Sequence, residues 1–188
     1  RIGAIALIGM SLAIAACLPV PEVYMAPAAD QGQPYGQGCG TLKKGLAIDK
    51  PVGSTTLRVI VEFRLDQPQP TFEFGIRQVS FQTSSAGRAT DQENPLTVIL
   101  STADIEFTWP GHHVTRQIKG TPVAGSSQGE IALEVRSVAY RQAFPVPELG
   151  ADSVRVQLPN MRIDGEWVKL PAVTFTRKRE VNVTPFNC

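Results

Sequence analysis

Few side chains of this 188-residue chain have the types and spacing that catalysis requires. The only two histidines, His112 and His113, are adjacent, and neighbouring residues on a strand point to opposite faces of a sheet, so the pair is poorly placed to bind one metal ion. A G-x-S-x-G nucleophile elbow and a Walker loop are absent, and no G-x-G-x-x-G motif follows an expected strand. The sequence therefore predicts no catalytic residue, no metal site and no cofactor, and we expect a protein that is not an enzyme.

Paired carboxylates are the other arrangement that could perform acid–base chemistry. By position alone, Asp104 with Glu106 on one strand and Glu62 with Glu73 across two strands are candidates. Charges on the solvated faces of strands explain both pairs better, because strand residues alternate between a buried and an exposed face.

Aromatic side chains indicate a second kind of site. Trp109 and Trp167 could stack on a sugar ring, and a pocket lined by Trp109, Tyr140 or Trp167 would favour a binding module for a small ligand or glycan. Core filling is the simpler interpretation of the two tryptophans, since large aromatic rings dominate protein cores. The binding module stays open as the alternative function.

An uncharged apolar stretch, residues 2–18, follows Arg1 at the start of the chain. It is shorter than the about 20 residues that cross a bilayer, and Pro19 and Pro21 would end a helix there. A basic residue, a short apolar core and small residues before a break are typical of a secretory signal. An uncleaved anchor helix is the alternative interpretation.

The end of this stretch, Ile14-Ala15-Ala16-Cys17, resembles the bacterial lipobox, in which an aliphatic residue and two small residues precede a cysteine. The resemblance implies that residues 1–16 are a signal peptide, that Cys17 carries lipid and that it becomes the mature N-terminus. Leu18, rather than Asp, follows the cysteine, and by resemblance to lipoprotein sorting this favours the outer membrane, on its periplasmic or surface face.

Two further cysteines, Cys39 and Cys188, are left if Cys17 carries lipid. An even number of cysteines in an exported protein indicates a disulfide, so we expect Cys39 and Cys188 to be bonded to each other. Two free thiols are the alternative.

The charge balance excludes one class of partner. The chain has 18 Lys and Arg and 17 Asp and Glu, and its formal net charge is +1. A nucleic-acid-binding protein needs a basic face, and Arg177-Lys178-Arg179, the only basic cluster, is followed at once by Glu180. We therefore expect no nucleic acid partner and interpret the cluster as a solvated strand end.

The chain divides into three parts. After the signal peptide, residues 17–40 are rich in Pro, Gly, Ala and Gln without a hydrophobic period, which predicts a lipid anchor and a flexible tether. Residues 41–188 predict one folded domain. Within it, residues 42–49 are expected to form at most a short helical turn.

Strand patterns fill that domain. Residues 55–66 alternate apolar with charged side chains, and residues 72–81 do the same with a slip at Gln78 that predicts a bulge. Asp164-Gly165, between two short apolar runs, predicts a hairpin with a type I′ turn. Further strand patterns cover residues 96–100, 105–109, 114–119, 131–135, 154–158 and 173–183.

About eight to ten strands with Pro and Gly turns predict an all-β fold, a β-sandwich on an immunoglobulin- or transthyretin-like plan. With an anchor and no site for chemistry, we expect a structural or accessory subunit of a membrane-associated assembly. It would contact other envelope proteins through exposed sheet edges and the membrane through lipidated Cys17.

Overall fold

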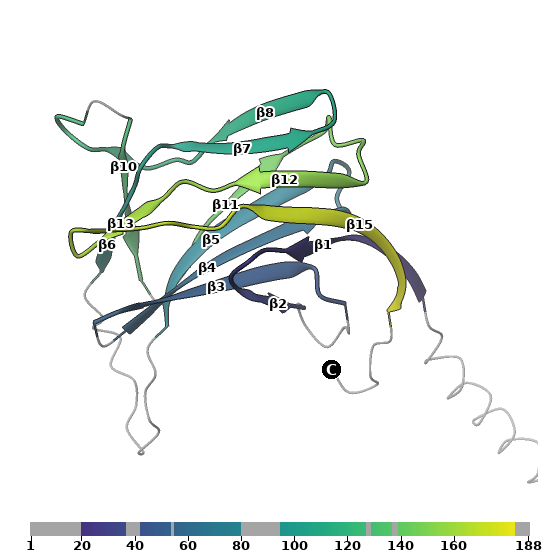
Figure 1. Cartoon of the computed structure of the whole chain (residues 1–188), viewed down its shortest axis with the longest axis horizontal. Helices are drawn as coiled ribbons and strands as arrows, with labels where there is room; N and C mark the ends of the chain where they lie inside the picture. Colours follow the sequence, from purple (N-terminus) through teal and green to yellow (C-terminus); the bar gives the residue numbers. More distant parts are fainter. Residues whose placement is uncertain are drawn as a thin grey trace, which may run out of the picture.

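The structure is a computed structural model that describes residues 20–36, 42–53, 55–79, 95–126, 129–136 and 139–182. Within these ranges the chain forms 15 strands and no helix, and the strands make three antiparallel sheets packed together (Figure 1). The predicted all-β sandwich is confirmed, although the strands outnumber the eight to ten expected. Very short strands account for part of the difference: β2 (Gln33–Tyr35), β9 (Thr121–Pro122) and β14 (Glu166–Val168).

Two sheets face each other, and the third closes one end of the sandwich (Figure 1). Sheet A has the order β1 (Val20–Ala28), β15 (Val173–Asn182), β12 (Ser153–Gln157), β7 (Asp104–Trp109) and β8 (His112–Gln117). Sheet B has the order β11 (Tyr140–Pro145), β5 (Thr71–Val79), β4 (Thr55–Arg64), β3 (Gly45–Val52) and β2. Sheet C has the order β14, β13 (Met161–Ile163), β6 (Leu96–Leu100), β10 (Ile131–Val135) and β9.

Within the described ranges the chain passes between sheets A and C at four places, and two of these passages, between β6 and β7 and between β12 and β13, lie side by side. The two passages are bonded together, since the Ser101 N–H donates to the Asn160 carbonyl at 2.9 Å and the Asn160 N–H donates to Ser101 Oγ at 3.1 Å. These bonds satisfy backbone groups that the sheet ladders leave unpaired at the corner.

An aromatic cluster forms the centre of the core between sheets A and B. Phe63 of β4 and Phe72 of β5 meet Phe107 of β7 and Phe175 of β15. The Phe72 and Phe107 centroids are 5.1 Å apart and their planes are almost perpendicular, the edge-to-face arrangement that ring quadrupoles favour. All four rings are buried, which explains why the apolar residues of these strands alternate.

The hairpin prediction is confirmed in detail. Strands β13 and β14 pair on either side of Asp164 and Gly165, whose φ angles are +49° and +85°. A type I′ turn requires positive φ at both positions, and an Asp-Gly pair supplies it at little cost.

Two local predictions were wrong. Residues 45–52 form strand β3 rather than a helical turn, because buried Leu46 and Ile48 face the core while the strand pairs along its whole length with β4. No bulge occurs at Gln78, since β5 pairs with β4 without interruption from Thr71 to Val79. The apolar alternation slips because Gln78, opposite the buried Leu57, is a polar residue on the inner face at the end of the strand.

The flexible tether is not observed for residues 20–28 and 33–35, which are strands β1 and β2. Strand β1 pairs with β15 along its full length and buries Met25 in the core. Pro21 and Pro27, two of the prolines that suggested a tether, are six residues apart in β1. Backbone groups at an even spacing point to the same side of a strand, so both missing N–H groups affect the same side. An edge strand tolerates this when that side faces away from its partner.

Candidate functional site

Sheets A and B meet along two long edges, and the edge between β8 and β11 is closed by polar bonds. Gln142 of β11 accepts from the Lys119 N–H at 2.7 Å and donates to the Gln117 carbonyl at 2.9 Å. The Tyr140 hydroxyl donates to the Lys119 carbonyl at 2.8 Å, and Arg116 reaches the Pro145 carbonyl at 3.0 Å. These side chains replace the backbone ladder that the two strands do not form.

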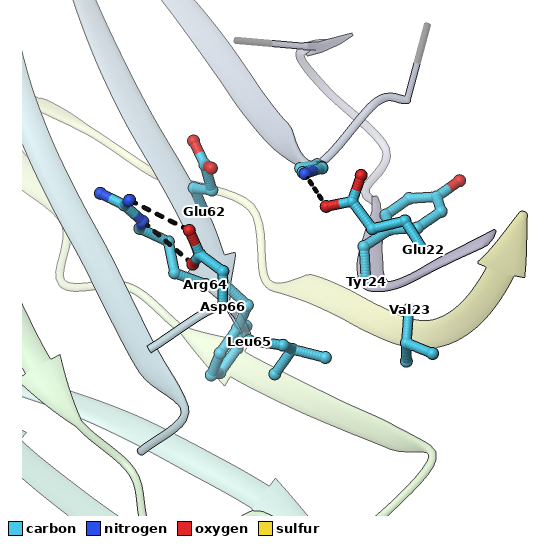
Figure 2. Close-up of a pocket in the computed structure, with 9 residues that line it drawn as sticks. Glu22, Val23, Tyr24, Glu62, Arg64, Leu65 and Asp66 are labelled. Atoms are coloured by element: carbon cyan, nitrogen blue, oxygen red, sulfur yellow. Dashed lines mark hydrogen bonds and ion pairs between the residues drawn. The ribbon is translucent and has the colours of Figure 1, made fainter. Parts of the chain in front are cut away.

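The opposite edge, between β1 and β4, holds a cavity of about 210 Å³ (Figure 2). Figure 2 shows Glu22 and Tyr24 on one side of it and Arg64 and Asp66 on the other. Most of its lining is polar or charged: Glu22, Val23, Tyr24, Lys44, Glu62, Phe63, Arg64, Leu65 and Asp66. The cavity is smaller than the roughly 300–1,000 Å³ of typical ligand pockets and lacks their apolar lining.

The charges of this cavity are paired within the protein. Lys44 bonds Glu22 across the edge, and Arg64 bonds Asp66 at 3.3 Å and Glu73 at 3.1 Å. The cavity is therefore suited to water or a small polar molecule rather than to an apolar ligand.

The ionisation of these groups does not indicate proton transfer near neutral pH. The hydrogen bonds from the Arg64 guanidinium lower the pKa of Asp66, and the same bonds raise the pKa of Arg64. Burial, followed by the hydrogen bond to Glu180 and that carboxylate's charge, raises the pKa of Tyr24 to about 12. A general acid or base works best with a pKa close to the operating pH, and all three groups are shifted away from it.

Glu62 and Glu73, one of the two predicted carboxylate pairs, are directly opposite each other on β4 and β5. Glu62 is only 4 % exposed, so the interpretation as a charge on a solvated strand face is wrong for this residue. Glu62 accepts from the Tyr35 hydroxyl at 3.3 Å, while Glu73 accepts from Arg64. The neighbouring cavity of about 10 Å³ has room for at most one water molecule. Each carboxylate therefore has its own partner, and no space for a substrate lies between them.

The other candidate acid–base and metal-binding residues each have different neighbours. Asp104 bonds the nearby Thr102, and Glu106 is exposed on β7. His112 stacks on Trp109 with centroids 5.3 Å apart, whereas the His113 ring lies 3.3 Å from the Thr108 hydroxyl. Within the described residues no group of three or more His, Cys, Asp or Glu side chains could hold a metal ion.

The two tryptophans have different environments. Trp109 is 6 % exposed and belongs to the core, as predicted, and Tyr140 is bound in the closed edge between β8 and β11. Trp167 is 47 % exposed on the edge strand β14, where core filling is the wrong interpretation. The Arg162 guanidinium lies 5.1 Å from the centroid of its indole, and Glu130 bonds the same guanidinium at 3.4 Å.

The predicted basic cluster lies in the middle of β15 rather than at a strand end, and of its three side chains only Lys178 and Arg179 are exposed. Arg177 approaches Asp152 at 3.9 Å and Lys178 approaches Glu180 at 3.9 Å, while Arg179 is exposed. Such exposed pairs contribute little to stability.

Three predicted site residues, Cys17, Cys39 and Cys188, lie outside the described residues, as does the predicted signal peptide. The lipid attachment and the disulfide therefore remain sequence-based predictions. In the part of the chain that the structure describes, no helix is long and apolar enough to cross a membrane.

Comparison of the chain with family models and with curated proteins shows no family. No family model matches it, and it matches no curated protein. Its function is consequently inferred from its own residues.

Proposed function

We propose that this protein is a lipid-anchored protein of the bacterial cell envelope that acts as a structural or accessory subunit of a membrane-associated assembly. The lipobox-like sequence that ends at Cys17 supports the anchor. A role in contacts rather than catalysis is supported by the partners of three candidate acid–base residues: Glu62 accepts from Tyr35, Glu73 accepts from Arg64, and Asp104 accepts from Thr102.

The observation that carries the protein-contact role is the exposure of Trp167 beside Arg162. Tryptophan and arginine are the residues most enriched at the energetic centres of protein interfaces. Glu130 and the indole both contact the Arg162 guanidinium, and these contacts favour one arrangement of the two side chains before a partner arrives. Preorganised side chains lose less conformational entropy on binding.

The position of Trp167 also supports a contact between proteins. Strand β14 is the last strand of sheet C, and its outer side has no neighbouring strand among the described residues. An exposed strand edge offers backbone donors and acceptors to an added strand of another chain. The tryptophan would then anchor that contact in a pocket of the partner.

The test is extraction of the native protein from membranes in mild detergent, followed by size-exclusion chromatography and mass spectrometry. We expect a stoichiometric complex with another envelope protein, which Trp167→Ala disrupts. His113→Ala removes an exposed ring from the edge strand β8 and should leave the complex intact. A lipoprotein that elutes alone at native abundance would reject the assembly role, and equal retention of the partner by both variants would reject Trp167 as the contact.

A separate experiment tests the lipid anchor at Cys17. Intact mass spectrometry of the membrane-extracted protein should give a chain that begins at Cys17 and carries acyl chains. A chain that begins before Cys17 and carries no lipid would reject the lipoprotein assignment.

A binding module for a small ligand or glycan is the second candidate, and the cavity between β1 and β4 is the observation that favours it. Trp109, Tyr140 and Trp167 do not line that cavity, so a sugar would lack the aromatic platform that the sequence suggested. Binding of a small polar molecule that Lys44→Ala and Arg64→Ala abolish would favour this candidate over an assembly subunit.

A further inference from the structure

The paired ends of β1 and β15 form a ribbon that curves away from the body of the sandwich (Figure 1). In this ribbon Pro21 is opposite Val181, and Val23 is opposite Arg179. Cross-strand partners and residues two apart on a strand share a face, so these four side chains belong to one face of the ribbon. We refer to Pro21, Val23, Arg179 and Val181 as the ribbon face.

The ribbon face is exposed and apolar, with one positive charge. Val23 is 45 % exposed and Val181 is 51 % exposed, which places them among the three most exposed large apolar side chains of the described residues. The next residue on the same side of β1, Met25, is fully buried in the core. The ribbon face is therefore the core-facing side of sheet A, continued beyond the point where sheet B covers it.

Charged side chains of both signs lie on the other face of the ribbon, where Lys178 approaches Glu180 at 3.9 Å. Glu22 and Glu180 are opposite each other in the register, where Glu22 bonds Lys44 and Glu180 accepts from the Tyr24 hydroxyl at 3.0 Å. The ribbon thus separates an apolar face with one cation from a face on which the carboxylates of Glu22 and Glu180 pair with lysines. A surface that combines aliphatic side chains with a cation fits the boundary between acyl chains and anionic headgroups.

The covalent distance to the anchor favours the same partner. Strand β1 begins at Val20, only three residues after Cys17. Because an extended chain spans at most about 3.3–3.6 Å per residue, those three residues reach roughly 10 Å. A lipid on Cys17 would hold the start of β1 close to the headgroups. A long tether, by contrast, would allow the domain to move freely.

We infer that the ribbon face docks on the membrane surface, with Val23 and Val181 at the headgroup–acyl boundary and Arg179 against anionic phosphate groups. This inference rests on the proposed lipid anchor and adds an orientation to it. Sheet C and the exposed Trp167, which belong to a different sheet from the ribbon, then stay available to a protein partner.

The test uses the full lipidated protein in vesicles of phosphatidylethanolamine and phosphatidylglycerol that contain a lipid with a photoreactive diazirine beside its headgroup. After irradiation, mass spectrometry should locate the lipid adducts on the peptides that contain residues 21–23 and 179–181. Val23→Asp with Val181→Asp should lower these adducts severalfold. Thr115→Asp, at an exposed position on β8, is the matched control and should leave them unchanged.

A second variant separates electrostatic attraction from apolar contact. Arg179→Glu should reduce the adducts in vesicles with phosphatidylglycerol and have little effect in pure phosphatidylcholine, because only the anionic lipid attracts the guanidinium. Circular dichroism of each variant checks that the exposed substitutions leave the sandwich folded.

The outcomes distinguish this inference from the proposed function. Adducts spread evenly over a lipidated protein, or concentrated on β8 or β14, would overturn the docking and leave the anchor in place. An intact mass without lipid at Cys17 would reject the anchor, and the docking with it.

Discussion

The ring of Tyr35 lies across Gly45, so close that a Cβ atom on residue 45 would be 2.5 Å from Tyr35 Cε1. The two residues are register partners on β2 and β3, and Glu62 is the partner of Gly45 on the other side, on β4. Because Gly45 has no side chain, the Tyr35 hydroxyl spans β3 and reaches Glu62 at 3.3 Å. A glycine thus permits a hydrogen bond to a buried carboxylate two strands away.

Gly45→Ala should therefore displace Tyr35 and weaken its bond to Glu62. Overpacking of this kind typically costs about 1–3 kcal/mol of unfolding free energy, which urea denaturation measures. Gly150→Ala is the matched control, since the nearest heavy atom to its added Cβ would be 4.0 Å away. Equal stability of the two variants would contradict this account of Gly45.

Phe72→Ala should be among the most destabilising single substitutions. Phe72 contacts the rings of Phe63, Phe107, Phe144 and Phe175, and removal of a buried ring costs about 3–5 kcal/mol. Thermal and urea unfolding of the variant measure the loss. Exposed Val181→Ala should change the free energy of unfolding by less than about 0.5 kcal/mol.

Gln142→Ala should open the edge between β8 and β11. The side chain accepts from the Lys119 N–H and donates to the Gln117 carbonyl, and a typical hydrogen bond contributes about 0.5–1.5 kcal/mol to stability. Hydrogen exchange should show faster exchange of the Lys119 amide in the variant. Gln157→Ala removes only a bond to the adjacent Leu158 carbonyl and should preserve the protection of Lys119.

Alkaline titration should distinguish Tyr24 from an ordinary tyrosine. Its burial and its bond to Glu180 raise the pKa of Tyr24 to about 12 in the folded protein, so the folded state favours the neutral phenol. The stability that this provides is complete below the unfolded-state pKa of about 10 and is lost as the pH rises toward the folded value. Tyrosinate absorbance should contain a component that titrates near pH 12, and Tyr24→Phe should reduce it, although burial also raises the pKa of Tyr140. A wild-type titration in which every tyrosine ionises near its ordinary pKa of about 10 would contradict the prediction.

The predicted bond between Cys39 and Cys188 should protect both thiols from alkylation until a reductant is added. A disulfide that closes so long a loop stabilises by roughly 4–5 kcal/mol on the chain-entropy model. Cys39→Ser and Cys188→Ser should then lower the unfolding free energy of the oxidised protein to the same extent. Full alkylation without reductant would show free thiols instead.

The sequence by itself determined most of the strands, because the alternation of apolar and polar residues follows directly from the two faces of a strand. It located β4, β6, β7 and β10, and it identified the β13–β14 turn because few residue pairs accept two positive φ angles. It also placed Glu62 opposite Glu73, since the two strands are joined by a short connection that fixes their register.

Only the tertiary structure decided that residues 20–28, whose sequence predicted a tether, form a strand of sheet A. Strand β1 has few alternating apolar residues, and its partner β15 lies about 150 positions away in the chain, so no local pattern could reveal the pairing. Only the tertiary structure likewise decided how exposed the two tryptophans and the valines of the ribbon face are. Alternation tells which side chains share a face, but the packing of sheets A, B and C decides that Trp109 is covered while Trp167, Val23 and Val181 are left exposed.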